Sequence, residues 1–187
     1  MNDQSNHTVS ENDLITGCIE GNPKSQRELY DRFASKMYGV CLRYAGNTND
    51  ANDLLQEGFV KVFNNLEKFR GEGSFEGWVR RIFINTCIEQ FRKKAKSYNI
   101  GEAHENIVED PGLDALDTLA AKDLLKIINQ LSPGYKTIFN LYVVEGYSHK
   151  EIAEMLNISE GTSKSQLARA KGVLKNILET KFKNINK

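Results

Sequence analysis

Apolar residues recur at intervals of three and four over most of this chain, which has 187 residues. That spacing places them on one face of an α-helix, and no run is long enough to suggest a strand-rich sheet. Only three prolines are present, and they fall between the periodic segments. The chain is long enough for one sizeable domain or two small ones. The pattern therefore predicts an all-α protein.

Capping and turn residues divide the first half of this pattern into separate helices. Ser10 is placed to cap a first helix, and Asn22 followed by Pro23 begins a second. Gly46 ends the second helix, and residues 48–50 open a third. The expected inner-face positions are Leu14, Ile15, Cys18 and Ile19, then Leu29, Tyr30, Phe33, Met37, Val40, Cys41 and Tyr44, then Leu54, Leu55, Phe59, Val62, Phe63 and Leu66.

A break in the helical period divides the chain into two parts. Residues 97–112 are polar and acidic, and they end in Asp-Pro-Gly. This composition predicts a flexible acidic linker that joins two small helical domains, one over 10–96 and one over 113–183. Periodic positions in the second domain are Leu113, Leu116, Leu119, Leu124, Ile127, Ile128 and Leu131, followed by Ile138, Phe139 and Tyr142 in a helix that begins at Ser132-Pro133.

The formal net charge is zero, but the charges are unevenly placed. Residues 78–96 hold six Lys or Arg and one acid, and residues 160–187 hold seven basic residues and two acids. Residues 97–123 hold seven acids and one Lys. Two basic blocks separated by an acidic one still present local positive patches, so a nucleic-acid partner is not excluded.

Several functional classes have no support in the sequence. The three cysteines, Cys18, Cys41 and Cys87, lie among apolar residues without metal-ligand spacing, which indicates buried thiols in a reducing compartment. No cofactor or metal is expected, and no phosphate-binding loop or nucleophile–base pair suggests an enzyme. Without a signal peptide or a long apolar run, no membrane insertion is expected and a cytoplasmic location is predicted.

The stretch SHKEIAEMLNISEGTSKSQLARAKGVL predicts a helix-turn-helix. Ser148 and Glu151 have the spacing of a capping box, and Asn157 is one of the few residue types that tolerate a left-handed corner. Ser159 can cap the second helix. That helix would turn Leu167, Ala170, Leu174 and Ile177 inward. Its outer face would carry the candidate DNA-reading residues Thr162, Lys164, Ser165, Gln166, Arg169 and Lys171.

Arg grips guanine and Gln grips adenine through paired hydrogen bonds, while flanking lysines suit phosphates. The alternative is an amphipathic helix whose positive face is only solvated.

A second basic helix follows a glycine-rich loop in the stretch RGEGSFEGWVRRIFINTCIEQFRKK. The loop and Phe75 are expected to shape a pocket for an unstacked base, as in single-strand binding proteins. Arg80, Arg81, Asn85 and Arg92 are the other candidate contacts. The alternative is that Phe75 and Trp78 belong to the core and the arginines are surface residues.

Three segments in order resemble the extracytoplasmic-function (ECF) group of bacterial sigma-70 factors. The segment that docks on the polymerase β′ subunit is resembled by DANDLLQEGFVKVFNNLEKF. The segment that melts and reads the −10 element is resembled by SFEGWVRRIFINTCIEQFRKK. The −35-reading domain is resembled by LSPGYKTIFNLYVVEGYSHKEIAEMLNISEGTSKSQLARAK. The resemblance covers residues 12–178. It implies that Asp53, Gln56 and Glu57 bind polymerase.

The resemblance implies a promoter-specificity subunit whose partners are core RNA polymerase (β′ and β), promoter DNA and an anti-sigma factor, and which is a monomer when free. The chain departs from the family pattern at Ser163, where an apolar residue is usual, and at Gln166 and Lys171, where Arg is frequent. Ser163 is expected to be half-buried and to hydrogen-bond back along its helix. The alternatives are a dimeric stand-alone regulator and an adaptor that binds polymerase without reading promoters.

Overall fold

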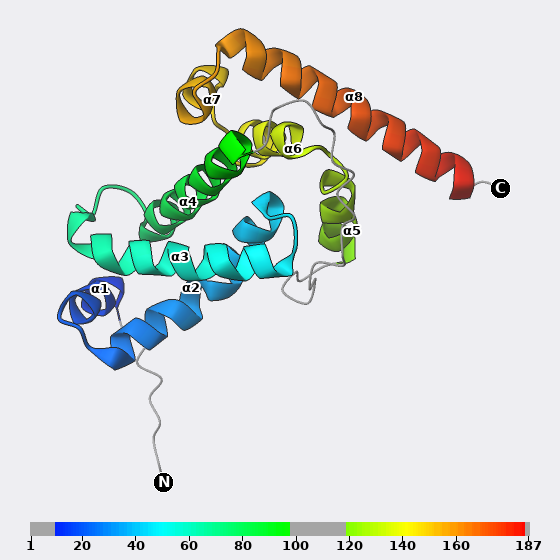
Figure 1. Cartoon of the computed structure of the whole chain (residues 1–187). Helices are drawn as coiled ribbons and strands as arrows, with labels where there is room; N and C mark the ends of the chain where they lie inside the picture. Colours follow the sequence, from blue (N-terminus) through cyan, green and yellow to red (C-terminus); the bar gives the residue numbers. More distant parts are fainter. Residues whose placement is uncertain (1–9, 98–118, 186–187) are drawn as a thin grey trace.

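The computed structural model describes residues 10–97 and 119–185, and within these residues all regular secondary structure is helical (Figure 1). The predicted linker, apart from Ser97, and the positions Leu113 and Leu116 lie outside the described residues. None of the described helices is both long enough and apolar enough to cross a bilayer.

The first half consists of α1 (Glu11–Ile19), α2 (Pro23–Tyr44), α3 (Thr48–Asn65), the short η1 (Leu66–Lys68) and α4 (Phe75–Ser97). As predicted, the side chains of Ser10 and Asn22 accept hydrogen bonds from the first backbone amides of α1 and α2. The Asn47 side chain caps α3 in the same way. These caps satisfy amides that have no partner within their own helix.

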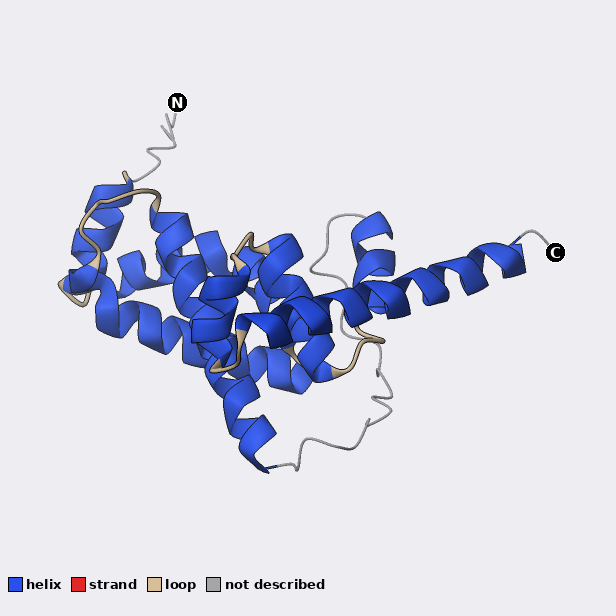
Figure 2. Cartoon of the chain, turned by 90° about the horizontal axis from the view of Figure 1, so that it is seen from above, coloured by secondary structure: helices blue, strands red, loops and turns tan. Residues whose placement is uncertain are grey.

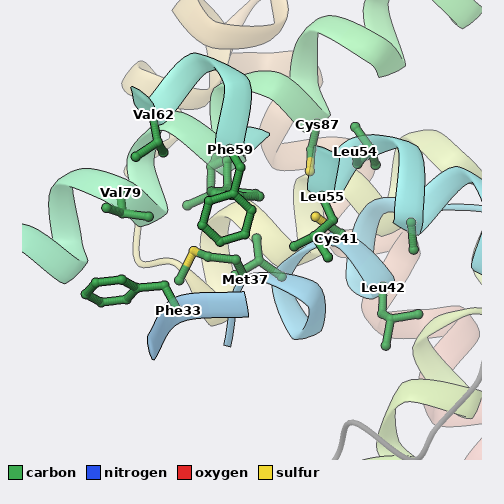
Figure 3. Packing of buried hydrophobic residues seen from close by; sticks show 14 of the residues in the cluster. Phe33, Met37, Cys41, Leu42, Leu54, Leu55, Phe59, Val62, Val79 and Cys87 are labelled. Carbon is green, nitrogen blue, oxygen red and sulfur yellow. The ribbon is translucent and has the colours of Figure 1, made fainter. Parts of the chain in front are cut away.

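The core of this half lies where α2, α3 and α4 meet. In Figure 3, Phe33 and Met37 from α2 face Phe59 and Val62 from α3, with Val79 of α4 beside them. All three cysteines are buried, and Cys41 and Cys87 lie close together in this view. The expected inner-face residues Ile19 and Tyr30 are instead exposed to 43% and 41%.

A glycine allows α3 and α4 to approach closely. A β-carbon on Gly58 would lie 2.2 Å from a ring carbon of Phe83, which is fully buried. The Phe83 ring then packs edge-on against Phe59, with ring centroids 5.2 Å apart. The contact fixes α4 against the core and determines which of its residues remain at the surface.

The second half consists of α5 (Leu119–Ile128), α6 (Pro133–Phe139), the π-helical η3 (Asn140–Val144), α7 (His149–Leu156) and α8 (Glu160–Ile185). Figure 2 shows the C-terminal part of α8 extending well beyond the other helices.

One expected core position in α5 is wrong by one residue. Leu125 is buried there, whereas Leu124 is 57% exposed.

Candidate nucleic-acid interface

The corner between α7 and α8 has the geometry that the sequence predicts. The Ser148 hydroxyl accepts from the Glu151 amide at 3.3 Å, and the Glu151 carboxylate accepts from the Ser148 amide at 2.8 Å. The hydroxyl and amide of Ser148 lower the pKa of Glu151 because they stabilise its charged form. Asn157 follows with φ 55° and ψ 51°, in the left-handed region. The predicted capping box and left-handed corner are therefore confirmed.

A polar contact that the sequence analysis missed joins α7 to α8 inside this corner. His149 Nδ1 lies 2.9 Å from Ser163 Oγ, and Ser163 is fully buried. The expectation that Ser163 is half-buried and bonds back along its own helix is therefore wrong. The His149 ring also stacks on Tyr142 at 4.4 Å between centroids, and the Lys171 ammonium lies 5.9 Å from the Tyr142 ring. These contacts tie the start of α8 to the elements before it.

The outer face of α8 holds the predicted DNA-reading side chains in two environments. Lys164, Ser165 and Arg169 are exposed, and Lys164 forms an ion pair with Glu160 at 3.3 Å. Lys171 is exposed as well, whereas Thr162 and Gln166 are half-buried. The amide of Thr162 donates to the Ser159 hydroxyl at 3.0 Å, which confirms Ser159 as the cap of α8.

On α4, the exposed face carries Arg81, Asn85 and Arg92. Asn85 lies at an open groove of about 250 Å³ between α3 and α4. The groove is lined by Lys61, Asn65, Lys68, Trp78, Ile82, Asn85, Thr86 and Glu89. Arg81 and Asn85 are one helical turn apart, so both side chains point to the same side of α4.

Phe75 does not take part in this surface, and its expected role in a base pocket is wrong. Its ring is fully buried and packs against Phe33, Phe69 and Trp78, with centroid distances of 5.6, 5.1 and 5.7 Å. The glycine-rich loop allows the chain to turn so that α4 begins with this aromatic ring in the core. The core interpretation of Phe75 is therefore the right one, and Trp78 is half-buried against the same cluster.

Comparison with known proteins identifies both halves of the chain. The family model described as "Sigma-70 region 2" matches residues 29–97, and "Sigma-70, region 4" matches residues 121–174. The ECF RNA polymerase sigma-E factor of Haemophilus influenzae is 30% identical over 179 residues, which cover 89% of this chain and 94% of that protein. The chain belongs to the ECF sigma factors. It therefore directs promoter recognition by RNA polymerase, and α4 and α8 belong to the two promoter-recognition regions.

One further relative and one solved structure are also similar to the chain. The ECF sigma factor SigW of Bacillus subtilis is 29% identical, over 83% of this chain and 90% of that protein. The solved sigma factor RpoE from Bartonella quintana, in complex with the anti-sigma factor NepR, shares the fold with a TM-score of 0.50 at 20% identity. That match covers 82% of this chain and 96% of that chain.

The predicted polymerase-binding residues of this sigma factor lie together on α3. Asp53 and Gln56 are exposed, and Glu57 is partly exposed and pairs with Lys61 at 2.9 Å. Val60, which the sequence analysis placed in no site, is 58% exposed one turn beyond Gln56. Acidic, amide and apolar groups thus share one face of α3 that points away from the core.

One predicted −10 contact, Arg80, is not on the exposed face of α4. Its Nε and Nη2 atoms donate to the Glu145 carboxylate at 2.7 and 2.9 Å, and Arg43 donates to the same carboxylate at 3.1 Å. Glu145 follows η3 in the second half, and its side chain is only 4% exposed. This contact between the halves was not visible in the sequence because Glu145 lies 65 and 102 positions from its partners.

Other side chains from the second half cap the C-terminal end of α2. The Lys136 ammonium donates to the carbonyl of Ala45 at 2.7 Å, and the Asn140 amide donates to the carbonyl of Arg43 at 2.7 Å. Burial lowers the pKa of Lys136 to about 8, because the charged ammonium has lost its water. The halves are thus joined by polar side chains, and burying one of them, Lys136, in its charged form costs free energy.

Proposed function

We propose that this sigma factor reads its promoters with two separate helices, α4 for the opened −10 strand and α8 for the −35 duplex. The observation that carries the proposal is that both helices present basic, hydrogen-bonding side chains to solvent on faces that the core does not use. A rigid helix that presents such side chains is suited to reading base edges or phosphates.

For the −35 element, the exposed Lys164, Ser165 and Arg169 are the principal contacts. The well-anchored start of α8 enters the major groove, as the second helix of a helix-turn-helix does. Arg169 is suited to a bidentate contact with guanine, and Lys164 and Lys171 to phosphates. Thr162 and Gln166 are half-buried, so their contacts are secondary.

For the −10 element, Arg81 and Asn85 form the reading pair, with Arg92 further along the same helix. Asn85 has both a donor and an acceptor with which to read the edge of an extruded base. The adjoining groove, with Trp78 at its wall, offers an unstacked base a partly apolar surface. Basic side chains on either side attract the single strand.

Polymerase is the second partner in this proposal. The exposed face of α3 with Asp53, Gln56 and Glu57 docks on the β′ subunit, and the second half contacts β. The functional units are the domains 10–96 and 113–183. The protein acts in the cytoplasm, as a monomer when free, and is held in check by an anti-sigma factor such as the one bound to the RpoE structure.

The free chain should bind promoter DNA only weakly. Each patch offers few phosphate contacts, and affinity that depends on phosphates falls steeply with salt. Core polymerase would hold both helices over one promoter and so raise their effective concentration.

The test is transcription by purified bacterial core polymerase on a pooled promoter library, with and without the protein. Starts that require the protein and share two upstream elements are the expected result. Arg169→Ala should relax the upstream element alone and Arg81→Ala the downstream element alone, while Lys183→Ala, at the far end of α8, should change neither. A chain that binds core polymerase but produces no starts would leave an adaptor role instead.

A further inference from the structure

Arg43 on α2 and Arg80 on α4 converge on a single carboxylate. Three guanidinium nitrogens approach the two oxygens of Glu145 at 2.7 to 3.1 Å. The two arginines belong to the first half of the chain, and the carboxylate belongs to the second. α2 and α4 pack against each other, so the two arginines would remain neighbours if the halves separated.

This arginine pair has more donors than the carboxylate can use. Arg43 Nε is buried and has no acceptor among the described residues, and neither has the hydroxyl of the adjacent Tyr44. Burial, and next the charge of Glu145, raise the pKa of Tyr44 well above its usual value. Buried donors without acceptors are unfavourable, so the site is only partly satisfied by a group with two oxygens.

The element that delivers Glu145 is itself unusual. It follows the π-helical turn Asn140–Val144. Such turns are rare in proteins, and those that occur are often found at functional sites. The next residue, Gly146, has φ 79°, which turns the chain away from the interface toward α7. Glu145 thus lies between a π-helical turn and a glycine with positive φ.

We propose that Arg43 and Arg80 form a binding site for a backbone phosphate of the promoter strand, which Glu145 fills in the closed chain. Two guanidinium groups that converge on one anion suit a phosphate as well as a carboxylate. Arg80 directly precedes Arg81 on α4, and both guanidinium groups act electrostatically on Tyr147, so a strand that contacts Arg81 would pass beside the site. This inference rests on the proposed function.

Glu145 and the phosphate need the same nitrogens, so one excludes the other. Capture of the −10 strand then requires the halves to separate, and the apparent affinity of the free chain is reduced by the fraction that is open. The ligand chemistry is an oxyanion of phosphorus, which free phosphate could also supply. The experiment therefore includes inorganic phosphate as a competitor.

The experiment measures binding of the full-length chain to a labelled single-stranded −10 oligonucleotide over a series of salt concentrations. Glu145→Gln should tighten binding by about tenfold or more, because the closed state loses its charged clamp. Glu154→Gln removes the same charge from an exposed position on α7 and serves as the matched control, with less than about a twofold change expected from charge alone.

Arg43 is then changed in the Glu145→Gln background. Arg43→Gln should reverse most of the gain and lower the salt slope by about 0.7, the value for one phosphate contact on a single strand. Arg43→Lys should retain much of the slope because it keeps the charge. Circular dichroism confirms that each variant is folded.

Three results would overturn the inference: equal gains for Glu145→Gln and Glu154→Gln, an unchanged slope for Arg43→Gln, or competition by inorganic phosphate, at matched ionic strength, that is the same with and without Arg43→Gln in the Glu145→Gln background. The proposed function is judged separately by transcription with core polymerase. If the wild-type chain produces promoter-specific starts while Glu145→Gln does not tighten binding, only the phosphate site is wrong.

Discussion

The two helices proposed to read promoter DNA differ in how the rest of the chain holds them. α4 is packed on α2 and α3 over an aromatic cluster, and one of its arginines is bound by Glu145 from the other half. α8 packs on α6 and α7 through the first half of its length and is mostly exposed beyond it, and its exposed Arg169 forms no ion pair within the described part of the chain. If α8 reads the −35 element and α4 the −10 element, as proposed, the −35 reader is accessible in the free chain, whereas one arginine of the −10 reader is held by Glu145.

This difference matches the order of events in initiation. Duplex −35 DNA is available before melting, but an unstacked −10 strand appears only once polymerase opens the promoter. With Arg80 held by Glu145, the free chain would bind single strands more weakly, although Arg81 and Asn85 stay exposed. Four predictions test this contrast.

The largest expected effect concerns the aromatic packing at the start of α4. Phe75→Ala should lower the free energy of unfolding by about 3–5 kcal/mol, because a fully buried ring is removed from an aromatic cluster. Urea unfolding measures this change. Arg81→Ala, on the exposed face of the same helix, should change stability by less than about 0.5 kcal/mol. A stable Phe75→Ala chain that has lost only −10 reading would restore the base-pocket role of this residue.

Substitutions on the exposed face of α8 should change base recognition. Arg169→Ala should cost about 1–3 kcal/mol at one base pair of the −35 element and relax specificity there. Lys171→Ala should weaken binding to all sequences alike, since a phosphate contact carries no base information. Holoenzyme affinities for a set of single-base −35 variants distinguish the two patterns, and uniform loss with Arg169→Ala would refute base reading.

The anchoring corner of α8 depends on a left-handed residue. Asn157→Val should destabilise the second half by about 1–2 kcal/mol, because a β-branched side chain is strained at φ 55°. Asn157→Gly should be nearly neutral because glycine adopts this conformation freely. Thermal unfolding of the two variants gives the comparison, and equal stability would mean that the corner relaxes without cost.

The stability of the folded chain should depend on pH through Lys136, which joins the second half to the end of α2. Its pKa is lowered to about 8 in the closed chain from an ordinary value near 10.5. The cost of burying the cation is therefore fully present below pH 8 and is relieved as pH rises toward 10.5. Of the charged neighbours, Asp50 on α3 partly offsets this lowering and Lys94 on α4 adds to it.

The folded chain should consequently gain about 1 kcal/mol from Lys136 between pH 8 and 9. Urea unfolding of the wild-type chain and of Lys136→Met gives this contribution as a difference, which cancels the opposing titration of Cys87 and Tyr44. Parallel pH profiles for the two chains would show that Lys136 is not buried as a cation.

Local signals in the sequence predicted the caps and the corner well. Ser10, Asn22, Ser148 and Asn157 act through residues within three or four positions, so their roles follow from spacing alone. The family and the two promoter-recognition regions could also be predicted, because the motifs are extended and ordered.

Features that depend on distant partners could not be predicted. Phe75 follows a glycine-rich loop whether its ring faces a base or the core, and only the packing of α2 against α4 decides this. The burial of Ser163 requires His149 as a partner across the corner. The ion pair between Arg80 and Glu145 joins residues from the two halves, and the spacing of apolar residues in the sequence does not predict it.

Chemical modification of individual arginines tests the central contrast most directly. Phenylglyoxal labelling followed by mass spectrometry gives a rate for Arg80 and Arg169 in the free chain and in the holoenzyme without DNA. We expect Arg80 to react slowly in the free chain and quickly in the holoenzyme, while Arg169 reacts quickly in both. Rapid modification of Arg80 in the free chain, or continued protection in the holoenzyme, would contradict a −10 reader that is covered by Glu145 and released by polymerase.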